Sequence, residues 1–185
     1  MSHVCPWWGG YFIDNRCRRL IHKPEAILVP YVQPGMAMLD FGCGMRFFAI
    51  PMSRLVGEKG RVIAADLQQK MLDVLNKRAR KAGVGDRIET HRCQTNSLGV
   101  TGSVDFALAF YSLHEVPDAQ SVIREIHGLI RPAGKFLIVE PPIRHVNAAG
   151  FENLLSLSQE MGFMVNDRMP SAGSPSLMTK HWTGC

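Results

Sequence analysis

The 185-residue sequence contains no closely spaced pair of cysteines. Its five cysteines are scattered along the chain, at Cys5, Cys17, Cys43, Cys93 and Cys185. A small disulfide-stapled domain carries an even set at regular spacing, and a zinc module carries Cys-x-x-Cys pairs, so the pattern disfavours both. Unpaired thiols are typical of a reducing compartment. The sequence therefore predicts a cytoplasmic protein with no metal site.

Long apolar runs and internal repeats are also missing. No segment reaches the roughly 20 apolar residues of a membrane-spanning helix, and Asp14 and Arg16 interrupt the N-terminal region where a signal peptide would be apolar. The formal charge of +5 comes from Lys and Arg scattered over predicted helix faces, which weighs against nucleic acid as a partner. We expect a single domain over residues 1–185 that binds neither membrane nor nucleic acid.

Short apolar runs alternate with amphipathic ones from residue 36 onward. The spacing predicts strands at 36–41, 61–65, 87–92, 104–110 and 135–140, and weaker strands at 163–167 and 176–181. It predicts helices at 47–56, 67–82, 118–130 and 147–161, with Asp118 as a cap and Gly83 as a helix end. Such alternation favours right-handed crossovers between parallel strands. The expected fold class is α/β, a three-layer sandwich with a central, mostly parallel sheet.

Two glycines, Gly42 and Gly44, follow the first predicted strand, and Asp66 follows the second. Ligands of open parallel sheets lie beyond the carboxyl ends of the strands. Glycines there let a ligand approach the backbone, and the next helix start offers free N–H groups. A carboxylate ending the second strand can accept both hydrogen bonds of a ribose diol. Together these residues predict a nucleoside-containing ligand.

The glycine loop lacks the third glycine of a dinucleotide fingerprint, because Phe47 occupies that position. Asp40, two residues before Gly42, suits a cationic ligand and suits a pyrophosphate badly. Both features weigh against an NAD-dependent oxidoreductase, which stays open as an alternative. S-adenosylmethionine carries an ammonium and a sulfonium, and fits better.

Four segments carry a family likeness: 38–44 (MLDFGCG), 63–66 (IAAD), 104–116 (VDFALAFYSLHEV) and 130–136 (IRPAGKF). They resemble the motifs of class I S-adenosylmethionine-dependent methyltransferases, over about residues 24–168. The likeness is greatest to the small-molecule branch that includes quinone-biosynthesis C-methyltransferases. It implies a Rossmann-like methyltransferase fold, S-adenosylmethionine as cofactor and a small-molecule methyl acceptor.

The resemblance also implies which residues form the cofactor site. Asp40 and the two glycines would line the methionine part, Asp66 would hold the ribose, and the remaining residues would flank the adenine or the methyl group. The full set is Asp40, Gly42, Cys43, Gly44, Asp66, Leu67, Cys93, Gln94, Phe110 and Tyr111.

Arg46 departs from the family pattern, which has a third glycine at that position. Its side chain either turns to solvent or pairs with the methionine carboxylate, leaving binding intact, or it obstructs the site. We favour the first outcome. The second motivates an alternative function, a non-catalytic module that binds S-adenosylmethionine or another nucleoside.

His114 follows the fourth predicted strand, on the side where an acceptor would lie. Its ordinary pKa near neutrality makes it a candidate general base, although it equally suits a purely structural role in the loop. Residues 1–33 are expected to form an N-terminal helical lid with the aromatic side chains Trp7, Trp8, Tyr11 and Phe12, and residues 34–185 the Rossmann-like core. Free thiols also suggest an arsenite methyltransferase, but no cysteine pair supports it.

Overall fold

The computed structural model describes residues 23–141, 148–168 and 175–180. Within them the strands are β1 (Ala37–Phe41), β2 (Arg61–Asp66), β3 (Ile88–Arg92), β4 (Val104–Phe110), β5 (Ile130–Val139), β6 (Phe163–Arg168) and β7 (Pro175–Lys180). The helices are α3 (Pro24–Leu28), α4 (Ala49–Val56), α5 (Gln69–Lys81), α6 (Ala119–Leu129) and α7 (Ala148–Glu160), with short 3-10 turns η1 (Gly85–Arg87) and η2 (Leu113–Glu115).

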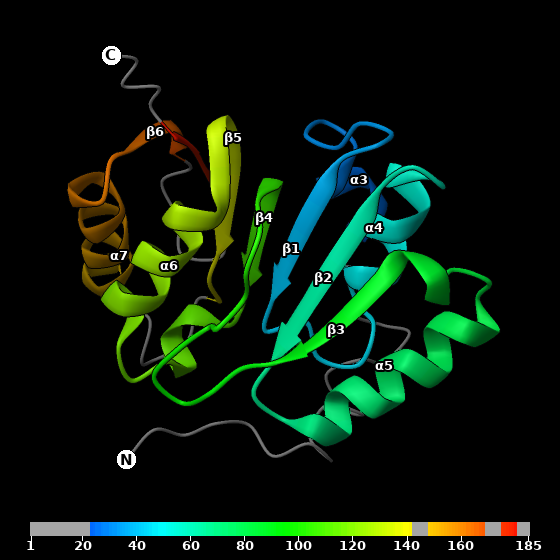
Figure 1. Cartoon of the computed structure of the whole chain (residues 1–185). Helices are drawn as coiled ribbons and strands as arrows, with labels where there is room; N and C mark the ends of the chain where they lie inside the picture. Colours follow the sequence, from blue (N-terminus) through cyan, green and yellow to red (C-terminus); the bar gives the residue numbers. More distant parts are fainter. Residues whose placement is uncertain (1–22, 142–147, 169–174, 181–185) are drawn as a thin grey trace.

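The described strands form one sheet in the order β3-β2-β1-β4-β5-β7-β6. The first five strands of that order are parallel, and β7 pairs antiparallel with β5 and β6. Helices α3, α4 and α5 lie on one side of the sheet, and α6 and α7 lie on the other (Figure 1). This confirms the three-layer α/β sandwich and the mostly parallel sheet.

The central strands are covered on both faces. All five residues of β1 are buried, as are six of the seven residues of β4, which is the expected burial of parallel strands between two helical layers. Alternate residues of β1 join different cores: Met38 packs with α4 and α5, whereas Leu39 and Phe41 pack with α6 and α7. The two apolar cores therefore hold the carboxyl end of β1 rigidly at the centre of the sheet.

Three elements begin two or more residues later or earlier than the sequence predicts: α5 begins at Gln69 and not at residue 67, and β5 and α4 differ as follows. Strand β5 begins at Ile130 and not at residue 135, because Ile130 pairs with Val104 before the register shifts and Lys135 pairs with Phe106. The extra residues bulge outward, with Ala133 at a φ of 63°. Helix α4 begins at Ala49, two residues later than predicted, because the preceding residues continue the turn after β1.

The end caps follow the sequence prediction. The Asp118 carboxylate accepts a hydrogen bond from the Ser121 backbone N–H at 2.9 Å, which caps α6. Gly83 has a φ of 69° and follows the last residues of α5. A left-handed residue there ends a helix, and glycine adopts that conformation without steric strain.

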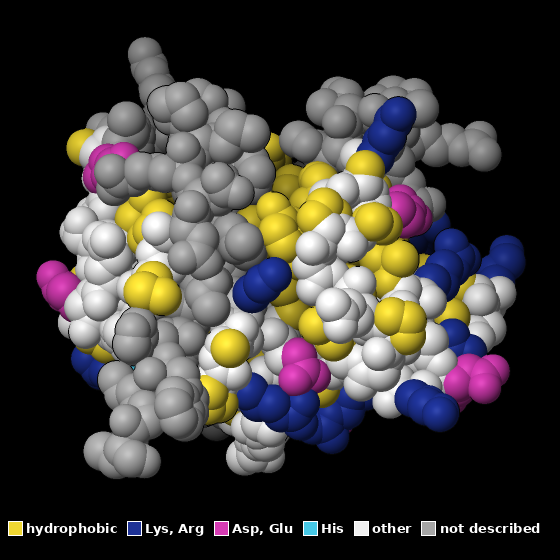
Figure 2. Space-filling view, turned by 90° about the horizontal axis from the view of Figure 1, so that it is seen from above, with side chains coloured by type: hydrophobic (Ala, Val, Ile, Leu, Met, Phe, Trp, Pro, Cys, Tyr) yellow, Lys and Arg dark blue, Asp and Glu magenta, His cyan; other side chains and the backbone are white. Residues whose placement is uncertain are grey.

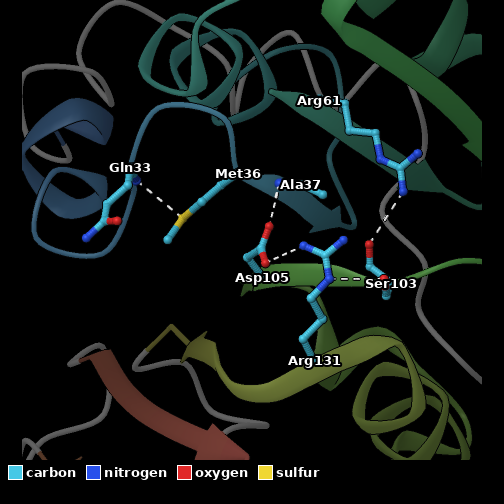
Figure 3. Close-up of polar contacts among 7 residues, drawn as sticks. All are labelled: Gln33, Met36, Ala37, Arg61, Ser103, Asp105 and Arg131. Carbon is cyan, nitrogen blue, oxygen red and sulfur yellow. Dashed lines mark hydrogen bonds and ion pairs between the residues drawn. The ribbon is translucent and has the colours of Figure 1, made fainter. Parts of the chain in front are cut away.

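A polar network ties the strands together at the edge where the parallel strands begin (Figure 3). The Asp105 carboxylate accepts a hydrogen bond from the Ala37 backbone N–H at 2.8 Å and pairs with the Arg131 guanidinium. Arg131 Nε also donates to the Ser103 hydroxyl at 3.2 Å. The network joins β1, β4 and β5 at the end of the sheet opposite to the glycine loop.

The face at which the parallel strands begin is seen in Figure 2, where Lys and Arg side chains gather along the lower and right-hand edges. In the part of the chain that the structure describes, no helix is both long enough and apolar enough to span a membrane.

The predicted aromatic lid falls within residues 1–22, outside the described residues. The described helix from the predicted lid segment, α3, packs against α4 through Leu28.

Candidate active site

One cavity of about 520 Å³ opens at the carboxyl ends of the parallel strands. This is the position that the fold class dictates for a ligand, and the volume falls within the usual range for small-molecule sites. All of the sequence-predicted site residues line it: Asp40, Gly42, Cys43, Gly44, Asp66, Leu67, Cys93, Gln94, Phe110, Tyr111 and His114. The structure therefore brings together residues from the loops after four different strands.

The glycine loop is fastened to the neighbouring strand by its backbone. Gly42 and Cys43 both donate to the Ala65 carbonyl, at 2.8 and 3.1 Å. Gly42 and Gly44 have φ values of 69° and 56°. A Cβ on Gly42 would lie 2.4 Å from Ser112 Cβ, whereas a Cβ on Gly44 would meet nothing within 4 Å. Gly42 is thus required for close approach to the β4 loop, and Gly44 leaves open space beside the cavity.

Asp66 connects the two cofactor loops. One carboxylate oxygen accepts the Gly44 N–H at 2.9 Å, and the other accepts the Gln68 N–H at 2.8 Å. Burial raises the pKa of Asp66, and these backbone donors act in the opposite direction. Each carboxylate oxygen can accept a second hydrogen bond, so both oxygens can still receive a ribose hydroxyl.

Asp40 carries the most unusual polar atom of the cavity. Its side chain is 2% exposed, and Oδ2 has no hydrogen-bond partner among the residues that the structure describes. Burial, followed by the nearby Asp66 carboxylate, raises the pKa of Asp40 from the usual 3.8 to about 7, and the Ala49 backbone N–H partly opposes this. A buried carboxylate oxygen without a partner is costly, and a proton, a water or the cationic group of a ligand can satisfy it. The ammonium of S-adenosylmethionine fits this requirement, and a pyrophosphate does not.

The two cavity thiols are buried and protonated. Burial is the main cause that raises the pKa of Cys43 well above its usual value, and that raises the pKa of Cys93 to about 12. Thiolates are the form that attacks electrophiles and binds soft elements. The thiols therefore act here as small apolar wall groups, which argues against the arsenite alternative. Within the described residues, no group of three or more His, Cys, Asp or Glu side chains has the geometry of a metal site.

Aromatic rings form the wall between the glycine loop and β4. The rings of Phe48 and Phe110 lie 4.5 Å apart between centroids, and those of Phe110 and Tyr111 lie 4.4 Å apart. Tyr111 has a φ of 59°, unusual for a residue with a side chain, and its N–H donates to the Val139 carbonyl at 2.7 Å. Backbone strain of this kind concentrates at functional sites.

His114 lies in η2, directly beyond β4, and is held by a residue that sequence reasoning missed. Its Nδ1 lies 2.5 Å from Oε2 of Glu140, and the other Glu140 oxygen accepts the Leu113 N–H at 2.8 Å. Glu140 follows β5 and is fully buried. A carboxylate at the end of a parallel strand is the same signal that identified Asp40 and Asp66, so the rule applied there would have found Glu140 too.

Arg46 lies away from the cavity. Its side chain lines a separate hollow of about 380 Å³, together with Arg54, Arg78 and Lys81. Arg46 is therefore not among the residues that line the cavity, and intact cofactor binding with this arginine in place stays a prediction.

Residues 32–170 match a family described as "Methyltransferase domain". The chain belongs to this methyltransferase family. It is 33% identical over 129 residues to a demethylmenaquinone methyltransferase of Lactobacillus johnsonii, which covers 68% of this chain and 53% of the relative. It is 29% identical over 119 residues to the ubiquinone/menaquinone biosynthesis C-methyltransferase UbiE of Shewanella sp. (strain W3-18-1), covering 64% of this chain and 47% of the relative.

A solved structure agrees with the fold of this methyltransferase family member. A SAM-dependent methyltransferase from Aquifex aeolicus superposes with a TM-score of 0.83 at 22% identity, over 95% of this chain and 98% of that one. These comparisons confirm the family resemblance and the Rossmann-like methyltransferase fold. The chain spans about half the length of the two curated relatives.

Proposed function

We propose that this protein is an S-adenosylmethionine-dependent methyltransferase that acts on a small-molecule acceptor. The proposal rests on one observation: every predicted cofactor residue lines the same cavity. There, an oxygen of Asp40 has no hydrogen-bond partner among the described residues, which favours a ligand with a cationic group. Family membership and the related quinone C-methyltransferases point to the same activity. The proposal includes one domain over residues 1–185 and a cytoplasmic location, which the free cysteines favour.

The bound cofactor supplies an already activated methyl carbon, so positioning accounts for much of the rate. Asp40 would hold the ammonium group, and Asp66 would hold the ribose. The open space over Gly44 lets the methionine part lie against the backbone. Leu67, Cys93 and Gln94 would surround the adenine.

The acceptor side is built from the ring wall of Phe47, Phe48, Phe110 and Tyr111. Aromatic rings pack favourably against another ring by offset or edge contacts. A relative is named for demethylmenaquinone, which makes a two-ring aromatic hydroquinone the first acceptor to test. A small aromatic acceptor is therefore the finer part of the proposal.

Calorimetry of S-adenosylmethionine and S-adenosylhomocysteine binding tests the cofactor assignment. The wild-type protein is expected to bind both at micromolar concentration, and Asp66→Ala is expected to lose at least tenfold in affinity because a ribose acceptor is removed. Asp73→Ala is the matched control. Asp73 is exposed on α5, and its carboxylate accepts a hydrogen bond from the Gln69 side chain of the same helix. Absence of wild-type binding would refute the proposed function.

A further inference from the structure

Glu140 fixes the position of His114 from two sides. It is fully buried, and its two oxygens bond the Leu113 N–H and His114 Nδ1 respectively. The imidazole is more basic than a carboxyl group, so the shared proton belongs on Nδ1. Neutral imidazole carries one proton, which leaves Nε2 as a proton acceptor. His114 lines the cavity and its side chain is 18% exposed, and Nε2 is the ring nitrogen that Glu140 does not engage.

We infer that His114 is the general base of this enzyme, that Glu140 is its positioning residue, and that the acceptor is a molecule whose attacking group loses a proton during methyl transfer. The inference rests on the proposed function. It selects hydroxyl-bearing aromatic acceptors over thioethers, tertiary amines and ionised thiols, which attack without a base. Nothing in the family comparison assigns a role to either residue.

The proton and electron balance of the step follows from this placement. His114 Nε2 takes the hydroxyl proton of the acceptor, and the electron pair left on the aryloxide oxygen forms the new bond from that oxygen to the methyl carbon; attack through a ring carbon would in addition release the hydrogen of that carbon to solvent. The methyl–sulfur bond breaks with its pair remaining on sulfur. The proton then leaves the imidazolium for solvent, so the step needs no oxidant, reductant or second acid.

The electrostatic surroundings of His114 support a basic imidazole. Burial acts to lower the pKa of His114, but the hydrogen bond and charge of Glu140, with the charge of Glu115, raise it above its ordinary value. The other titratable groups of the cavity are Asp40, Asp66, Cys43, Cys93 and Tyr111. Among these, Asp40 has its pKa raised to about 7, so its titration must be separated from that of His114 in any pH profile.

Glu140→Gln is the sharpest variant, because it keeps the size of the side chain and its carbonyl can still accept the Leu113 N–H. Its amide N–H₂ then faces Nδ1, which must give up its proton, so the proton moves to Nε2 and blocks the base. Nitrogen-15 NMR of the protein without cofactor or acceptor measures which ring nitrogen of His114 carries the proton. We expect the neutral wild-type ring protonated on Nδ1, the Glu140→Gln ring protonated on Nε2, and a lower His114 pKa in the variant.

Kinetics with a matched pair of acceptors test the acceptor class. The probes are 1,4-dihydroxynaphthalene, which must lose a proton, and 2-naphthalenethiol, which is already ionised at pH 8. At saturating cofactor, Glu140→Gln and His114→Gln are expected to lower kcat for the hydroquinone by about 100-fold or more, and to change thiol methylation less than threefold. Glu89→Gln, an exposed carboxylate on β3, is the control and should change neither rate.

The pH profile separates the two titrating groups. In the wild type, kcat for the hydroquinone should rise with pH at the NMR-measured pKa of His114, because only the neutral ring accepts a proton. Asp40 should instead affect the KM of the cofactor. A wild-type ring protonated on Nε2 would overturn the dyad, and turnover of the thiol alone or of neither probe would overturn the acceptor class. In both cases intact calorimetric binding of S-adenosylmethionine would leave the proposed function standing.

Discussion

Replacing Asp40 by Asn should make the protein more stable above neutral pH and weaken its hold on the cofactor. The Asp40 carboxyl is 2% exposed, and burial raises its pKa from 3.8 to about 7. Each pKa unit corresponds to about 1.4 kcal/mol, so ionising this group in the folded protein costs about 4 kcal/mol in total. Asn has nearly the same shape and carries no charge, which removes that cost.

The pH window follows from linkage. Between the unfolded value of 3.8 and the folded value of about 7, the folded protein binds more protons than the unfolded chain, so stability falls as pH rises. The range from pH 5 to pH 7 covers about two pKa units, or about 3 kcal/mol. The unbonded amide of Asn costs about 1–3 kcal/mol at every pH, so it cancels when two pH values are compared.

Urea unfolding of both proteins at pH 5 and pH 8 measures this difference. The stability of Asp40→Asn relative to wild type should increase by about 3 kcal/mol between the two pH values. Calorimetry should show that wild-type affinity for S-adenosylmethionine weakens as pH falls below 7, and that the variant binds at least tenfold more weakly with little pH dependence. Parallel stability curves for the two proteins would refute the reasoning, since the buried charge would then have no energetic effect.

Two further substitutions, Gly42→Ala and Arg46→Gly, test the glycine loop, with Gly83→Ala after α5 as the control for the first. Gly42→Ala should destabilise the fold by about 2–4 kcal/mol, because it adds a 2.4 Å clash with Ser112 to the strain of a left-handed backbone. Gly83→Ala, with the same φ of 69° and open space around it, should lose only about 1–2 kcal/mol in thermal unfolding, and equal losses would disprove the clash. Arg46→Gly should change cofactor affinity less than threefold, because Arg46 lines the separate hollow, and a clear gain in affinity would mean that the arginine reaches the site.

The fold was largely predictable from apolar periodicity. The central strands carry continuous apolar runs because both of their faces are covered, and this pattern located β1, β2 and β4 within one residue of their observed bounds. The start of β5 was not predictable, because residues 131–134 bulge out of the sheet and carry no periodic signal. The pairing of Ile130 with Val104 depends on how β4 and β5 meet in the folded sheet, and the local sequence does not encode it.

The residues predicted to bind the cofactor all line one cavity, because each lies at the end of a parallel strand or in the loop after it and the strand order brings these ends together. Their role in cofactor binding stays a prediction. The acceptor half was predicted less completely. Glu140 directly follows β5, so the strand-end rule used for Asp66 would have found it, but its contact with His114, 26 positions earlier, arises only when β4 and β5 pair. Phe47 and Phe48 read as an ordinary helix start, although their rings pack onto Phe110 and line the cavity.

The sequence by itself determined the alternation of strands and helices, the glycine loop and the acids that end β1 and β2, because these depend on short-range spacing. The tertiary structure determined the burial, the pKa values and the contacts of the residues in the site. Burial between the two apolar cores raises the pKa of Asp40 and of both cavity thiols, and the turn after β1 places Arg46 outside the lining of the cavity. Desolvation and the pairing of distant side chains depend on how the chain packs in three dimensions, and no local pattern contains them.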